Sequence, residues 1–329
     1  MKSELQNSSA RKNRPFGPRC VHSPQATRKE LPSSNGPCQL CWHSQRGSKS
    51  SIFRCRGVLQ FTLKKLLLLL LPFLGSALEV QPWFGDCLEF HFLGSYAYSF
   101  FDKVQEGVPK LNYTFQSNVA YLGLDFSPTP EWSVDAELQL ADTSKQNFNF
   151  RSFAAQARYL WLDDIIGDKM SLATGVSARF TNTDSLHDIS CPYHANCDLE
   201  LNFAFGKEFD FSDAWAWRFW GFGAVGHANK GSPWVRGIFS IETNYDDRHK
   251  FAIFADGING YGRYTTVSIN HFNGYAKIRQ KSIDLGFRYG YRIGVYGTLR
   301  FTYERRVLAK SCPEQVNAFV FSYLLPFSL

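Results

Sequence analysis

The sequence lacks a stretch that could cross a membrane as a helix. Its apolar run, residues 66–71, is far shorter than the roughly 20 residues that a spanning helix needs, and the mean hydropathy is −0.26. Walker-type phosphate loops, dinucleotide fingerprints and HExxH motifs are also missing. These absences argue against a helical membrane protein and against common nucleotide-dependent and zinc enzymes.

An excess of basic charge is missing from most of the chain. Residues 1–57 hold 11 basic and 2 acidic residues, whereas residues 78–329 hold 23 basic and 27 acidic residues. The net charge of +7 therefore comes from the front of the chain. Nucleic acid is not an expected partner of the remainder.

A secretory signal is predicted over residues 58–77. From Phe61 the chain reads FTLKKLLLLLLPFLGSA, which is a basic start, a short apolar run and a small-residue end. We expect cleavage after Ala77.

The 57 residues before this signal are rich in Ser, Pro, Arg and Lys and show no apolar periodicity. They are interpreted as a disordered or mis-called N-terminal extension, with Val58 as an alternative start. A CxxC pair, Cys38 and Cys41, leaves open a small zinc-binding unit, although no second pair of ligands accompanies it.

After Ala77 the apolar residues alternate with polar ones. In residues 132–140, apolar Trp132, Val134 and Ala136 alternate with Ser133 and Asp135. Strands with one apolar and one polar face, repeated in blocks of about ten residues, are typical of transmembrane β-barrels. Twelve segments show this pattern: 88–101, 113–126, 132–141, 148–162, 170–182, 197–209, 214–227, 234–244, 249–256, 276–291, 295–306 and 316–327.

The pattern predicts an all-β fold, a transmembrane antiparallel β-barrel of about 12 strands over residues 78–329. An even count places both chain ends at the periplasmic rim, where turns are short. Residues 264–272 also read as a strand and are assigned to a long external loop to keep this parity; 14 strands is the alternative. A soluble secreted β-sandwich also alternates, but would not crowd aromatic residues at strand ends.

The end of the chain carries a resemblance. Phe319, Phe321, Tyr323, Leu325 and Phe327 alternate along the last segment, as in the Gram-negative outer-membrane β-barrel proteins that the chain resembles. The chain departs from that pattern by ending in Ser and Leu after the last Phe. The resemblance implies a place in the cell outer membrane, with lipid and the barrel-assembly machinery as partners.

A narrower resemblance lies near the start of the predicted barrel. Residues 81–85 (QPWFG) and 88–90 (LEF) are similar to predicted outer-membrane proteins of chlamydia-like bacteria.

Charged residues on the polar faces are candidate lining for the lumen. Opposed charges can sort solutes by a transverse field, or they can fill a narrow interior with ion pairs; both remain open. The candidates are Arg158, Arg179, Arg218, Arg236, Arg288, Arg300, Asp135, Glu137, Glu200, Glu242, Asp284 and Glu304.

Cysteine and histidine gather between the fifth and sixth segments, in a predicted external loop. Two cysteines six residues apart in an exported loop favour a disulfide between Cys191 and Cys197. The alternative is a zinc site formed by His187, Cys191, His194 and Cys197. Cys312 is expected in the last external loop, and Cys87 near the periplasmic rim.

The predicted function is a porin-like channel for small polar solutes. The alternative is a structural or adhesive surface protein whose external loops bind a partner. Ser185, His187 and Asp188 are the one nucleophile and base combination near the external rim, which is too common a set for an enzyme to be predicted. No cofactor is expected, and the oligomeric state is left open.

Overall fold

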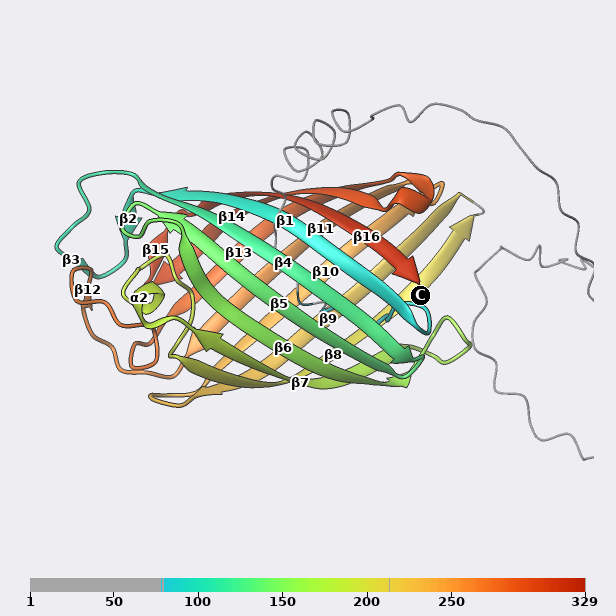
Figure 1. Ribbon diagram of the computed structural model, residues 1–329, viewed down its shortest axis with the longest axis horizontal. Coiled ribbons are helices and arrows are strands. Elements are labelled where there is room, and N and C mark those ends of the chain that lie inside the picture. Colours follow the sequence, from blue (N-terminus) through green and yellow to red (C-terminus); the bar gives the residue numbers. More distant parts are fainter. Residues whose placement is uncertain (1–77, 79, 213, 329) are drawn as a thin grey trace, which may run out of the picture. The chain divides into compact units, whose positions relative to one another are not determined.

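The computed structural model describes residues 78, 80–212 and 214–328, which form a closed antiparallel barrel of twelve strands (Figure 1). The first and last strands pair from Glu89↔Ser328 to Phe100↔Asn317 and close the ring. The predicted twelve strands are confirmed. The ring consists of β1 (Glu89–Phe101), β4 (Phe115–Thr129), β5 (Trp132–Thr143), β6 (Asn149–Leu162), β7 (Ser171–Thr181), β8 (Cys197–Ser212), β9 (Trp215–Ala228), β10 (Trp234–Tyr245), β11 (His249–Gly260), β13 (Lys281–Arg292), β14 (Thr298–Lys310) and β16 (Asn317–Ser328).

Alternation decides which face of each strand meets the interior. In β5, Asp135 and Glu137 are 1% exposed, whereas Trp132 and Val134 are 46% and 45% exposed. A wall with polar groups inside and an apolar band outside suits a barrel in lipid, since closure leaves no unpaired strand edge. No helix among the described residues has the length and apolar character needed to cross a membrane.

Aromatic residues gather at the rim that carries the short turns. Trp132 packs edge-on against Tyr159, whose ring also contacts Trp161, and Trp215 packs against Tyr245. Such girdles mark the membrane interface. The predicted aromatic ends of these strands are therefore confirmed at this rim.

Short and long connections separate to opposite rims. The short-turn rim holds the start of β1 and the end of β16. The long connection between β11 and β13 contains one short strand, β12 (Val267–Ser268), so residues 264–272 add no strand to the ring, as predicted. Several boundaries were wrong by three residues or more. β13 begins at Lys281 rather than 276, and β14 begins at Thr298 rather than 295 because Val295 lies in a 3-10 turn, η1 (Gly294–Tyr296). Four strands end later than predicted: β4 at Thr129, β8 at Ser212, β11 at Gly260 and β14 at Lys310.

The long connections fold into a cap at the other rim. It contains α2 (Thr183–Leu186) and two small sheets, in which β3 (Gly107–Val108) pairs with β12 and β2 (Lys103–Val104) pairs with β15 (Pro313–Glu314). Figure 1 shows these elements together at the left end. The cap has an apolar core, whose buried members are Phe101, Phe115, Ile189, Val267, Phe272, Tyr275 and Cys312.

A short described segment before β1 lies inside the barrel. Residues 80–84, here termed the inner segment, pack against inward-facing side chains: Trp83 is buried with Trp220 and Phe222, and Val80 packs on the same cluster. The sequence did not predict this placement, because the segment has no periodic pattern. The inner segment reaches from the short-turn rim into the lumen.

Candidate functional site

All twelve predicted lumen residues occupy inward-facing positions of their strands, and most of them meet an opposite charge. Three pairs join predicted residues: Arg158–Asp135 at 3.6 Å, Arg179–Glu137 at 2.7 Å and Arg236–Glu200 at 2.9 Å. Arg218 pairs with Glu208, and Asp284 with Arg306 at 2.7 Å. Ion pairs therefore fill part of the interior.

The densest filling lies along β5, β6 and β7. The Glu137 carboxylate accepts hydrogen bonds from Arg179 at 2.7 Å and from Gln139 at 2.6 Å. Gln156 donates to Asp135 at 3.1 Å. Buried charges are tolerated when they are paired and hydrogen-bonded, so this wall is a packed polar layer.

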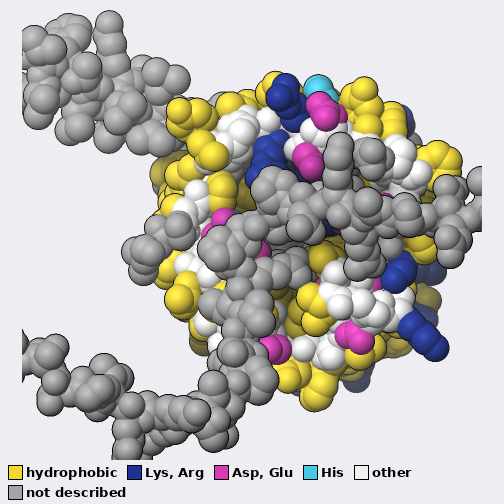
Figure 2. Space-filling view, turned by 90° about the vertical axis from the view of Figure 1, so that its right-hand side faces the viewer, with side chains coloured by type: hydrophobic (Ala, Val, Ile, Leu, Met, Phe, Trp, Pro, Cys, Tyr) yellow, Lys and Arg dark blue, Asp and Glu magenta, His cyan; other side chains and the backbone are white. Residues whose placement is uncertain are grey.

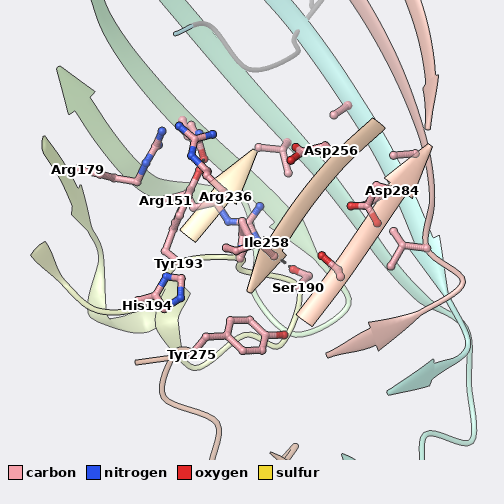
Figure 3. A pocket seen from close by; sticks show the side chains of 18 of the residues that line it. Arg151, Arg179, Ser190, Tyr193, His194, Arg236, Asp256, Ile258, Tyr275 and Asp284 are labelled. Atoms are coloured by element: carbon pink, nitrogen blue, oxygen red, sulfur yellow. Dashed lines mark hydrogen bonds between the residues drawn. The ribbon is translucent and has the colours of Figure 1, made fainter. Parts of the chain in front are cut away.

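A cavity of about 410 Å³ lies between this wall, the cap and the inner segment. Its lining carries both signs of charge. Figure 3 shows Arg151, Arg179 and Arg236 on one side and Asp256 and Asp284 on the other. The cap contributes the remaining face of the cavity through Ser190, Tyr193, His194 and Tyr275.

A second, smaller space of about 40 Å³ lies toward the short-turn rim. Its charged lining is mainly basic: Arg218, Lys250, Arg288 and Arg300, with Glu242. Figure 2 views this rim and shows hydrophobic side chains around much of the circumference, with charged side chains between them.

The inner segment separates the two spaces through contacts with the wall. Trp83 Nε1 donates to Asp164 Oδ1 at 2.8 Å, and Arg158 Nη1 donates to the Gln81 carbonyl oxygen at 2.6 Å. Gln81 Nε2 donates to Glu242 Oε1 at 3.1 Å. These contacts come from three regions of the barrel, so the segment is held across the lumen rather than along one strand.

Asp164, in the turn after β6, is held in its charged form. Burial would raise the pKa of its carboxyl group, but hydrogen bonds from the Glu208 N–H, Ser171 and Trp83 outweigh burial and hold that pKa below its ordinary value. The hydrogen bond from Trp83 is therefore charge-assisted at neutral pH.

Four charged residues of the cavity are not among the predicted lumen residues: Arg151, Asp198, Asp256 and Arg306. Asp256 and Arg306 are the last residues of the predicted strands 249–256 and 295–306, whereas the strands continue to Gly260 and Lys310. Arg151 follows from a local irregularity: the pairing of β5 with β6 shifts between Gln139 and Leu140. By strict alternation Arg151 would face lipid with Phe153, and the β-bulge turns it inward instead.

The structure does not support the predicted disulfide between Cys191 and Cys197. Both are free thiols. Cys191 is fully buried under the cap, whereas Cys197 shares the outward face of β8 with Leu199 and Leu201. The barrel wall separates the two side chains, which sequence spacing could not reveal.

The alternative zinc site is not assembled either. Within the described residues, no three side chains from His, Cys, Asp and Glu are placed to hold a metal ion. His187 bonds to the Phe272 carbonyl oxygen at 2.8 Å, and the His194 ring stacks on Trp234 with centroids 3.8 Å apart. Burial lowers the pKa of His194 to about 4, although Glu200 acts in the opposite direction, so the ring is neutral at pH 7.

Ser185, His187 and Asp188 do not form a catalytic arrangement. Ser185 Oγ donates to Gln146 Oε1 at 3.2 Å, and Asp188 accepts from Thr143 Oγ1 at 2.5 Å. A nucleophile must share a hydrogen bond with its base, and these three side chains bond elsewhere.

Solved structures with the same architecture are barrels of bacterial outer membranes. An outer-membrane channel from Pseudomonas putida F1 superposes with a TM-score of 0.53 at 13% identity, over 77% of this chain and 100% of that chain. The chain has the fold of an outer-membrane β-barrel. The NanC porin has a TM-score of 0.47 at 9% identity, over 73% of this chain and 100% of that chain. No protein-family model and no curated protein sequence matches.

Proposed function

We propose that the protein is a porin-like channel of the outer membrane for small polar solutes, and that the inner segment and the cap close its lumen. The observation that carries this proposal is the charged cavity of about 410 Å³ inside a closed barrel with an apolar outer surface. Ion pairs alone could fill the interior of a purely structural barrel, whereas here a space with a charged lining remains. The short-turn rim faces the periplasm and the cap faces outward.

Closure differs at the two ends of the lumen. The cap has its own apolar core and is tied to the barrel by backbone hydrogen bonds, such as Gly274 N–H to the Leu186 carbonyl oxygen at 2.9 Å. The inner segment has five residues, and it is held by the burial of Trp83 and by a small number of side-chain contacts. Short segments with few buried contacts open most readily, so the inner segment is the movable part.

No catalytic step is part of this proposal, since the lumen offers charges and hydrogen-bonding groups but no paired nucleophile and base among the described residues. The partners proposed are outer-membrane lipid, the barrel-assembly machinery and the transported solutes. The structural or adhesive role remains the competing proposal.

Solute flux into liposomes tests the channel. Residues 78–329, refolded into liposomes, should admit small sugars and amino acids and cause swelling, at a rate that falls with solute size. Folded protein, recognised by heat-modifiable migration, that admits no solute would contradict the channel and favour the structural role.

A further inference from the structure

On each charged side of the cavity, some charged groups have no ion pair among the described residues. On the basic side, Arg179 and Arg236 are neutralised by Glu137 and Glu200. Arg151 has no ion pair within the described residues. It is 4% exposed, its Nη2 donates to Ser190 Oγ at 3.0 Å, and its buried Nε has no hydrogen-bond partner.

The opposite side carries too much negative charge. Asp256 and Asp284 are direct cross-strand partners of β11 and β13, and Glu304 lies on the next strand, β14. Arg306 pairs with Asp284 alone. Among the described residues, Asp256 and Glu304 form no ion pair. Like charges placed directly opposite each other are destabilising, so a cation here would be favoured.

The two uncompensated sides face each other. β6, which carries Arg151, and β11, which carries Asp256, are five steps apart in the ring of twelve strands, which is nearly opposite. Figure 3 shows the same separation of the arginines from the aspartates. A bound solute would therefore need a negative group at one end and a positive group at the other.

We propose that the cavity binds short zwitterionic peptides, with the terminal carboxylate at Arg151 and the terminal ammonium between Asp256 and Glu304. An unpartnered guanidinium N–H donor suits a carboxylate, and two carboxylates that have no ion pair of their own suit an ammonium group. A cavity of about 410 Å³ is within the usual range for small-ligand sites. Because the charges approach from nearly opposite walls, a peptide spans them better than a single amino acid.

Asp198 and Tyr193 also line the cavity and do not change this assignment. The Asp198 carboxylate accepts from the backbone N–H groups of His194 and Ala195, both at 3.1 Å. Tyr193 donates to Gln139 at 2.7 Å, and its ring lies against Arg179. The groups of these two residues are occupied, so neither competes for the ends of the ligand, and Arg151 is the cavity arginine without an ion pair among the described residues.

Capped peptides test the assignment without altering the protein. Triglycine has no side chains, so at neutral pH only its two end charges can be recognised. Equilibrium dialysis with refolded 78–329 in detergent should show binding of triglycine, and at least about tenfold weaker binding of N-acetyl-triglycine and of triglycinamide. Equal binding of the three, or tighter binding of triglycinamide, would overturn the proposal, since the latter indicates a simple cation site.

Two variants assign each end of the peptide. Arg151→Gln should weaken triglycine binding at least about tenfold and leave the affinity for triglycinamide unchanged. Asp256→Asn should also weaken triglycine binding at least about tenfold, and it should leave the affinity for N-acetyl-triglycine unchanged. Lys230→Gln, in the exposed loop after β9, is the charge-matched control and should change nothing. Loss of all three peptides in either variant would contradict the assignment.

This inference rests on the proposed channel for access of the peptide to the cavity, but the binding site and the channel are tested by different measurements. Dialysis is repeated with Trp83→Ala, in which the inner segment is loosened, so that access does not limit binding. Charge-selective binding without flux would retain the site and reject the channel. Flux without charge-selective binding, or no triglycine binding in either folded protein, would reject the site.

Discussion

Trp83→Ala should open the lumen, because the buried Trp83 ring anchors the inner segment on an apolar cluster of the barrel wall. The side chain is 9% exposed and packs on Ala204, Trp220, Phe222 and Ala224. Replacing a buried Trp by Ala costs about 3–5 kcal/mol in comparable cores. At about 1.4 kcal/mol per tenfold, the released fraction should rise between roughly a hundredfold and a few thousandfold.

Single-channel recording in planar bilayers measures this change. Wild-type 78–329 should open rarely, and Trp83→Ala should stay open for a much larger share of the time at the same unit conductance. Trp161→Ala is the matched control, since Trp161 is 61% exposed on the outer face of the barrel and does not touch the inner segment. An unchanged open fraction in folded Trp83→Ala would refute closure by the inner segment.

A substitution in the barrel wall should also release the inner segment. A Cβ atom at Gly206 of β8 would lie 2.7 Å from the Trp83 ring and 2.8 Å from Pro82. Since the ring is packed closely on β8 and β9, the added methyl group should displace it, and Gly206→Ala should raise the open fraction without changing the segment itself.

Three further results are expected. Glu137→Gln leaves Arg179 buried beside a neutral group, and should lower the free energy of unfolding by about 3 kcal/mol, measured by urea titration in lipid vesicles; a change below about 0.5 kcal/mol would contradict the buried pair. Titration of unfolded 78–329 without reductant should find four free thiols, whereas two would restore the predicted disulfide. The pKa of His194 is lower in the folded cap than in the unfolded chain, so the unfolded state takes up a proton first as the pH falls. The contribution of the neutral His194 ring to the stability of the cap is therefore complete above pH 6.5 and is lost as the pH falls toward about 4. The loss lowers the free energy of unfolding by up to about 3 kcal/mol. Hydrogen exchange of residues 183–196, corrected for intrinsic rates, should follow this curve in wild type and be flat in His194→Gln.

Strand number and facing were predictable because alternation is a local property. Each apolar block of the sequence became one strand of the ring, and Asp135, Glu137 and Arg179 face inward as their spacing predicts. Parity then assigned residues 264–272 to a loop, and the ring of twelve confirms it.

Features that depend on tertiary contacts were not predictable. The inward turn of Arg151 comes from a bulge against β5, and strict alternation would place it in lipid. The inner segment has no periodicity, and its docking depends on a pocket formed by four distant residues. The loop between β7 and β8 showed cysteines six apart, but not that one lies beneath the cap and the other on the outer wall.

The central claim is that the inner segment closes a lumen which otherwise conducts, and removing that segment tests it most directly. Residues 86–329 and residues 78–329 are refolded in parallel, checked for heat-modifiable migration and recorded in the same planar bilayers. The account predicts sustained stepwise currents from the shorter chain and brief openings from the longer one. No current steps from the folded shorter chain would contradict it.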